Sequence, residues 1–259
     1  MKTVQRTVQL PRRPTRTRGI AVALALALAL TACSKAADSE PVPTSTTEAV
    51  QDSAAGDQTV VDVDTNGTTT MDQTRLDAEP ADLPAGTLTA AEIDGLLLMR
   101  EEEKLAHDVY VYLYDLWQVR VFSNIAEAET THTDAVQTLL DRYGLEDPAA
   151  GNAAGVFTNP DLQALYDELV DRGSESLVEA LRVGALIEDL DIVDLRSLQT
   201  DTVANIATVY ANLEKGSRNH LRAFMSNLDR QGETYTPTYL STAEFEEIVS
   251  SPTERGNRG

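Results

Sequence analysis

The residues whose types and spacing have the clearest chemical meaning lie between Asn124 and Tyr143, a segment with the apolar period of an amphipathic helix. Glu129 and His132 interrupt its apolar stripe, and their spacing of three residues places both side chains on one helix face. A Glu-x-x-His motif directed into a helical core is typical of bundles that hold dinuclear iron or manganese. Surface helices also contain this motif by chance, so its meaning depends on what the other helices contribute.

Three further predicted helices also carry polar groups on apolar stripes. They begin at sites with helix-start chemistry, such as the capping box Thr89-Ala90-Ala91-Glu92. The polar stripe residues are Glu103 in a helix from Thr89 to about Trp117, Glu188 and Asp191 in a helix from about Ser174 to Leu198, and Ser217 and His220 in a helix from Asp201 to Arg230.

Four of these stripe residues are carboxylates that would face one core. Burying an unpaired carboxylate costs several kcal/mol, and neighbouring like charges raise that cost. Two divalent cations would balance four carboxylates, and histidine nitrogen is a good additional ligand for iron or manganese. The alternative is a wet cleft, or carboxyl groups that stay protonated. The predicted metal ligands are Glu103, Glu129, His132, Glu188, Asp191 and His220.

The helix pattern predicts an all-α fold, a four-helix bundle formed by residues 87–250. A long crossover, residues 144–173, joins the second and third long helices and carries a short helix from Pro160 to about Asp171. A strap at 233–240 leads to a short C-terminal helix that begins at Ser241, and residues 251–259 are predicted to be a disordered tail.

The two predicted hairpins repeat internally. The interval from Glu103 to Glu129 equals that from Asp191 to Ser217, and both hairpins then place a histidine three residues further on. Two similar hairpins that face each other would form a pseudo-two-fold site. Ser217 stands where the first hairpin has Glu129, so the site is expected to be asymmetric.

The N-terminal segment has the pattern of a bacterial lipoprotein signal. A basic stretch precedes an apolar run at 19–30, and Leu30-Thr31-Ala32-Cys33 resembles a lipobox. This resemblance implies removal of residues 1–32 and lipid attachment at Cys33; ordinary secretion is the alternative. Residues 33–86 are acidic and lack apolar periodicity, which predicts a disordered linker. We therefore expect an extracytoplasmic protein that its lipid anchors to the cell membrane.

Several stretches of the helical region resemble known families. The positions of Glu103, Glu129-x-x-His132, Glu188 and His220 are similar to those of metal ligands in the ferritin-like superfamily. More closely, REEEKLAHDVY, FSNIAEAETTH, VGALIEDLDIVDL and GSRNHLRAF resemble a bacterial ferritin-like family, domain of unknown function 2202, over about residues 88–250. The resemblance implies two bound iron or manganese ions, and Ser217 departs from the glutamate of many relatives.

Two classes of function follow. The first is a redox metalloprotein that acts on a small oxidant or on metal ions, as a peroxidase, a catalase-like enzyme or a ferroxidase. Tyr110, two turns from Glu103, could then hydrogen-bond a ligand or carry an electron, or it could simply fill the core. The second class is a non-enzymatic surface binding module, with a structural metal or none. A net charge of −21 argues against nucleic acid as a partner, and a homodimer is among the expected assemblies.

Overall fold

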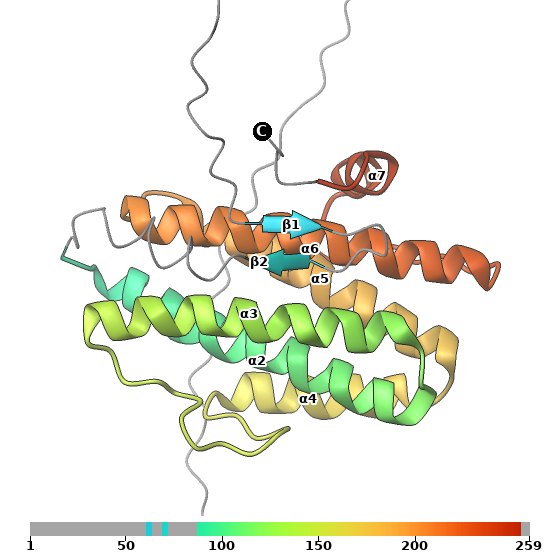
Figure 1. Ribbon diagram of the computed structural model, residues 1–259, viewed down its shortest axis with the longest axis horizontal. Helices are drawn as coiled ribbons and strands as arrows, with labels where there is room; N and C mark the ends of the chain where they lie inside the picture. Colours follow the sequence, from blue (N-terminus) through green and yellow to red (C-terminus); the bar gives the residue numbers. More distant parts are fainter. Residues whose placement is uncertain (1–60, 64–68, 72–86, 255–259) are drawn as a thin grey trace, which may run out of the picture. The chain divides into compact units, whose positions relative to one another are not determined.

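The computed structural model describes residues 61–63, 69–71 and 87–254 (Figure 1). Residues 87–254 contain helices and connecting segments only, which confirms the prediction of an all-helical fold for this part of the chain. The helices are α2 (Ala90–Trp117), α3 (Arg120–Tyr143), α4 (Pro160–Gly173), α5 (Leu177–Gln199), α6 (Ala204–Arg230) and α7 (Thr242–Ser250). Within the described residues, no helix is both long and apolar enough to cross a bilayer.

Two short strands lie inside the segment that the sequence predicts as a linker. β1 (Val61–Val63) and β2 (Thr69–Met71) pair antiparallel, with Asp62 opposite Thr70. The sequence contains no strong signal for this pairing, because each strand is only three residues long. The predicted signal peptide 1–32, including the run 19–30, and Cys33 lie outside the described residues.

The four long helices form two hairpins. Helix α2 packs against α3, α5 packs against α6, and the hairpins meet through contacts of α2 with α5 and of α3 with α6. The short helix α4 belongs to the crossover between the hairpins and packs on α2 and α5 (Figure 1). One face of each long helix is thereby directed into a common interior.

Helix starts combine local and long-range capping. The predicted capping box at Thr89 is present, and Ser176 and Ser241 cap α5 and α7 through their hydroxyl oxygens. The predicted start of α6 at Asp201 is wrong, because this residue adopts a left-handed conformation (φ 60°) and Val203 is the N-cap residue. The N–H of Val203 instead donates to Glu92 Oε1 at 2.9 Å, so α2 supplies the cap of α6.

The apolar core consists of two clusters, and the polar stripe residues lie between them. On α2, Met99 belongs to one cluster and Leu105 to the other, with Glu103 between them in sequence. On α3, Ile125 and Val136 divide in the same way around the Glu129–His132 motif. The polar groups therefore occupy an interior layer with packed hydrocarbon on both sides, and water has little access to them.

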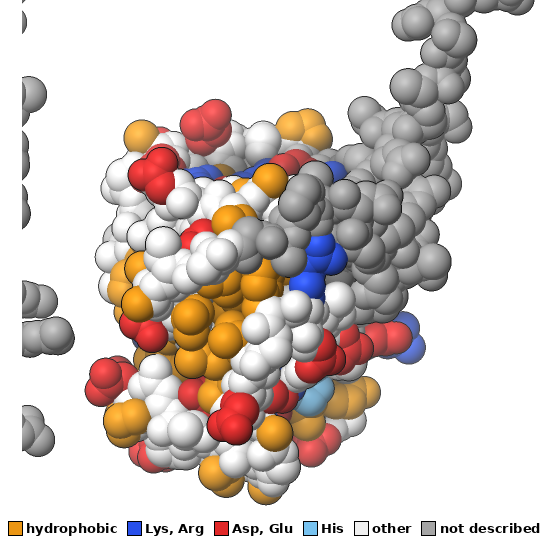
Figure 2. Space-filling model, turned by 90° about the vertical axis from the view of Figure 1, so that its left-hand side faces the viewer, with side chains coloured by type: hydrophobic (Ala, Val, Ile, Leu, Met, Phe, Trp, Pro, Cys, Tyr) orange, Lys and Arg blue, Asp and Glu red, His pale blue; other side chains and the backbone are white. Residues whose placement is uncertain are grey.

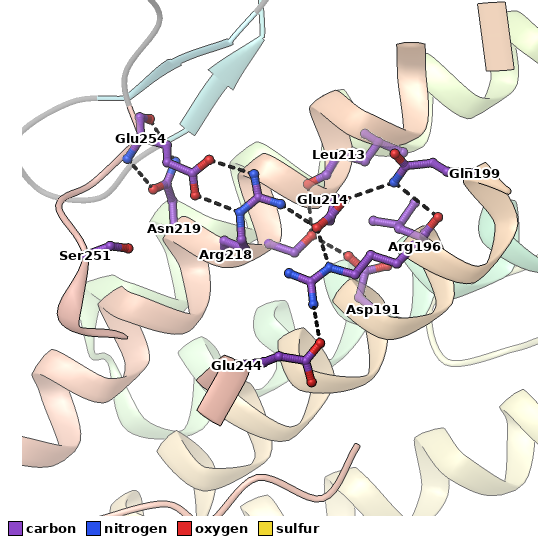
Figure 3. Close-up of polar contacts among 12 residues, drawn as sticks. Asp191, Arg196, Gln199, Leu213, Glu214, Arg218, Asn219, Glu244, Ser251 and Glu254 are labelled. Carbon is purple, nitrogen blue, oxygen red and sulfur yellow. Dashed lines mark hydrogen bonds and ion pairs between the residues drawn. The ribbon is translucent and has the colours of Figure 1, made fainter. Parts of the chain in front are cut away.

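The C-terminal segment is attached to α6 as far as Glu254, and residues 255–259 of the predicted tail lie outside the described residues. The Glu254 carboxylate accepts hydrogen bonds from Arg222 and from Arg218. The Arg218 Nε–Oε1 and Nη2–Oε2 distances are 2.7 and 2.6 Å (Figure 3). The backbone of Glu254 also exchanges two hydrogen bonds with the side chain of Asn219. These contacts fix the outer face of α6, the helix that carries His220.

The surface reflects the acidic composition. Figure 2 shows apolar side chains gathered in a hollow on one face, and the charged side chains around them are mostly acidic. This face has the sign of charge that the net charge of −21 implies.

Candidate metal centre

Five predicted ligands converge in the polar layer. Each of the four long helices contributes, and all five side chains are at most 2% exposed. They are Glu103 from α2, Glu129 and His132 from α3, Glu188 from α5 and His220 from α6. Burial of three carboxylates and two imidazoles in one layer requires compensation of their charge and hydrogen-bonding capacity.

Glu129 is the centre of the cluster. Its Oε2 lies 2.7 Å from His132 Nδ1, and its Oε1 lies 2.9 Å from His220 Nδ1. Each histidine also faces a second carboxylate: His132 Nδ1 is 3.3 Å from Glu103 Oε2, and His220 Nδ1 is 3.5 Å from Glu188 Oε2. One carboxylate is thus shared between two imidazole–carboxylate groups.

These short distances do not correspond to hydrogen bonds. Among the described residues, neither ring nitrogen of His132 or His220 has a hydrogen-bond partner in acceptable geometry, nor has Glu103 Oε1. Two atoms bound at about 2.1 Å to one octahedral ion, at a right angle to each other, lie about 3 Å apart. The short N–O distances therefore match the separation of ligand atoms that share an ion.

The cluster offers two sets of donors that could each hold a metal ion. In each set, one atom from every residue lies within 4.8 Å of the others, and Glu129 belongs to both sets. One set is Glu103, Glu129 and His132, and the other is Glu129, Glu188 and His220. Carboxylate oxygen with imidazole nitrogen is a donor set that suits iron and manganese, although it does not identify the metal.

The electrostatics of the metal-free cluster show the strain that a cation would relieve. Burial raises the pKa of Glu103 to about 7, and it also raises the pKa of Glu188. Burial opposes ionisation of Glu129 as well, but the imidazoles of His132 and His220 lower its pKa overall. Conversely, the carboxylates outweigh desolvation at the histidines, raising the pKa of His220 to about 9 and that of His132 well above its usual range. Without metal, protons must supply the missing positive charge.

Asp191, the sixth predicted ligand, borders the cluster without joining either donor set. It is half-buried on α5, and its Oδ2 accepts a short hydrogen bond from Ser217 Oγ on α6. Burial and the charges of Glu103 and Glu188 raise its pKa well above the usual range for aspartate. The structure therefore places Asp191 within the field of the cluster and one helical turn from Glu188.

Tyr110 contacts the cluster directly. Its hydroxyl donates to Glu188 Oε1 at 2.5 Å, and its ring packs against Phe224 at a centroid distance of 5.3 Å. Because the side chain is fully buried, the hydroxyl and Glu188 hold each other in place without competition from water. Tyr110 thus positions a carboxylate of the cluster and fills the core at the same time.

A small cavity reaches the carboxylates from the side of α4. Its volume is about 20 Å³, and about 10–15 Å³ is enough for one water molecule. Apolar side chains of α2, α4 and α5 form most of its wall, with Tyr239 of the strap at its edge. The polar residues that line it are Glu102, Glu103, Glu129, Glu188, Asp191 and Tyr239. The cavity therefore has room for a water molecule beside the carboxylates.

The structure pairs the polar stripes differently from the predicted repeat. The equal intervals match Glu103 with Asp191, whereas in the structure Glu103 faces His132 and Glu188 faces His220. The intervals within these facing pairs are 29 and 32 residues, because the two hairpins differ in the position of their turns. Glu188, rather than Asp191, is therefore the counterpart of Glu103.

Two buried carboxylates that support the site have no distinguishing sequence signal. Glu101 accepts from the backbone N–H groups of Thr158 and Asn159, which holds the crossover against α2. Asp189, next to Glu188, accepts from Tyr235 Oη and from three successive backbone N–H groups at 238–240, which holds the strap. Both act on segments distant in sequence, so local patterns could not identify them.

Comparisons with known proteins find matches to the helical region of this chain. A family model described as an uncharacterized protein domain, DUF2202, matches residues 92–252. The uncharacterized protein MJ0754 of Methanocaldococcus jannaschii is 53% identical over 176 residues, which cover 67% of this chain and 95% of that protein. The crystal structure of the hypothetical protein MJ0754 is similar with a TM-score of 0.65 and 52% identity, and the match covers 67% of this chain and 99% of that chain.

Proposed function

The chain belongs to the DUF2202 domain family, and we propose that its helical domain is a ferritin-like four-helix bundle that holds two iron or manganese ions. The observation that carries this proposal is the position of Glu129, whose two oxygens face the Nδ1 atoms of two buried histidines without hydrogen-bond geometry. Glu103 with His132 would hold one ion, Glu188 with His220 the other, and Glu129 both.

We propose that the bound ions act on a small oxidant, oxygen or peroxide, or oxidise ferrous iron. Iron or manganese in such a site supplies a change of oxidation state, which no protein side chain of the cluster provides as readily. The residues supply a dry environment, fixed ligand positions and a cavity of about 20 Å³ beside the carboxylates. A cavity of this size favours a molecule of a few atoms over an organic substrate.

Metal binding is the first test, on the purified full chain. The wild type should bind about two manganese or ferrous ions per chain, and His132→Ala should bind fewer while it keeps its helical content. His107→Ala is the matched control, because His107 is partly exposed and contacts Asp108 instead of the cluster. Binding at trace stoichiometry in the wild type would contradict the metal centre and favour the non-enzymatic surface module.

Redox activity is the second test. Metal-loaded wild type should consume hydrogen peroxide or oxygen faster than His132→Ala that has been incubated with the same amount of metal. Two bound ions without turnover of peroxide, oxygen or ferrous iron would indicate a structural metal centre in a binding module.

We also propose that lipid on Cys33 anchors the protein outside the cytoplasm, on the basis of the lipobox resemblance at 30–33. Cys33→Ser should abolish incorporation of labelled palmitate and release the protein from the membrane fraction. Unchanged labelling of the variant would rule out this anchor.

A further inference from the structure

Facing positions in the two hairpins can be compared by counting residues. When two antiparallel helices pack side by side, three residues forward on one helix correspond to three residues backward on the other. Glu103 faces His132, so Ala106 lies level with Glu129 in the first hairpin. Asp191 and Ser217 are the pair at the same level in the second hairpin, since Glu188 faces His220.

The two level pairs contain the same kinds of side chain in opposite order. The first hairpin has the small Ala106 on α2 and the carboxylate Glu129 on α3. The second has the carboxylate Asp191 on α5 and the small Ser217 on α6. Each hairpin thus places one carboxylate at this level, but from different members of the helix pair.

We infer that Asp191 supplies to the metal centre, from α5, the carboxylate that position 217 lacks, and that Ser217 leaves room for it. This inference rests on the proposed metal centre and adds a fourth carboxylate ligand to it. With Asp191, the four carboxylates balance the four positive charges of two divalent ions. The serine in place of a glutamate then has a role, because it leaves room for a side chain that approaches from the neighbouring helix.

The surroundings of Asp191 support this role. Asp191 lines the same cavity as Glu103, Glu129 and Glu188, so no packed side chain separates these carboxylates from a common space. Arg196 and Arg218 each pair with Glu214, at 2.7 and 2.5 Å, rather than with Asp191 (Figure 3).

The contacts of Ser217 allow Asp191 to change partner. Ser217 Oγ lies within hydrogen-bond distance of both Asp191 Oδ2 and the backbone oxygen of Leu213, the latter at 2.9 Å. A hydroxyl has one proton to donate. If Asp191 turns towards a metal ion, the hydroxyl still has an acceptor in Leu213, so no buried donor is left unsatisfied.

Relocation of the carboxylate tests the inference. Manganese is titrated into full-length protein, and binding is counted from the loss of the electron paramagnetic resonance signal of free aqueous Mn²⁺. Wild type should bind two ions, whereas Asp191→Ala and the isosteric Asp191→Asn should bind the second ion at least ~10–100-fold more weakly, because loss of a group that only supports a ligand already has an effect of this size. The double variant Asp191→Ala/Ser217→Glu should recover the second ion.

Asp194→Ala is the matched control, since it removes another partly buried carboxylate of α5 one turn further on, outside both donor sets. It should leave both affinities close to those of wild type, with circular dichroism confirming the fold of each variant. The inference is overturned if Asp191→Asn binds two ions as tightly as wild type, if Asp194→Ala weakens binding equally, or if the folded double variant fails to recover the second ion. A wild type that binds no manganese overturns the metal centre itself.

Discussion

Removal of metal should reverse the pH dependence of stability. In the metal-free protein, burial raises the pKa of Glu103 from an ordinary value of 4.5 to about 7. Burial lowers the pKa of His220, but the surrounding carboxylates outweigh this effect and raise the pKa from 6.5 to about 9. In both cases the folded chain binds protons more tightly than the unfolded chain, so folding is favoured at the acidic side of each range.

The magnitude follows from these two ranges. Stability linked to Glu103 is lost as the pH rises from 4.5 to about 7, and stability linked to His220 is lost from 6.5 to about 9. At about 1.4 kcal/mol per pKa unit, each range corresponds to about 3.5 kcal/mol. For a domain of this size, 1 kcal/mol shifts Tm by roughly 2–4 °C, so the upper range alone should lower Tm by roughly 7–14 °C.

The metal-loaded protein should behave in the opposite way. Metal replaces these protons, and its affinity rises with pH because the ligands must be deprotonated. Bound metal also stabilises the native state, by about 2.7 kcal/mol when free metal is ~100 times its Kd. The difference in Tm between loaded and metal-free protein should therefore grow from pH 6 to pH 9.

Calorimetric melts at pH 5, 7 and 9 would measure this difference, with chelator or with manganese under anaerobic conditions. The chelated His220→Ala variant is the control, and it should lose the part of the pH dependence above pH 6.5 that His220 contributes, while the part that His132 contributes remains. A chelated wild type whose Tm is constant or rises between pH 6.5 and 9 would refute the electrostatic account of the cluster.

Three substitutions test the support of the site. Tyr110→Phe removes the donor to Glu188 and should weaken manganese binding ~10–100-fold without unfolding; equal affinity in a titration would contradict the positioning role. Asp189→Ala removes the acceptor of the strap and should cost about 3 kcal/mol in urea unfolding and expose 233–240 to protease; wild-type resistance would show that the strap is held otherwise. Gly184→Ala places a Cβ 2.3 Å from the ring of Phe224 and should cost about 1–3 kcal/mol, visible as a lower Tm; an unchanged Tm would indicate that the ring moves freely.

Features determined by neighbouring residues could be predicted from the sequence. The capping boxes at Thr89 and Ser241 mark helix starts because the groups that satisfy each other are three residues apart. The start of α6 was misplaced because its cap, Glu92, lies more than a hundred residues away. The start of α3 lies at Arg120, before the predicted Asn124, and no local signal marks it because its N-cap residue Val119 has no capping side chain.

The sequence predicts which residue types form the site, but it predicts less well which of these residues face each other. Polar residues on apolar stripes identify Glu103, Glu129, His132, Glu188 and His220 because burial of such groups is costly anywhere in a core. The facing of Glu188 and His220 depends on where the second hairpin turns, and equal sequence intervals do not determine that. The contact between Ser217 and Asp191 likewise requires the register of α5 against α6.

In the proposed metal centre, the position of Glu129 also determines when both ions can bind. Its two oxygens face one histidine of its own hairpin and one of the other, so neither half of the domain contains both donor sets. During synthesis, the second set is incomplete until His220 has been translated and the hairpins have docked. Full metal binding would then require that both hairpins have folded and docked. Two hairpins produced separately, by a cut in the crossover loop, would recover full binding only upon recombination.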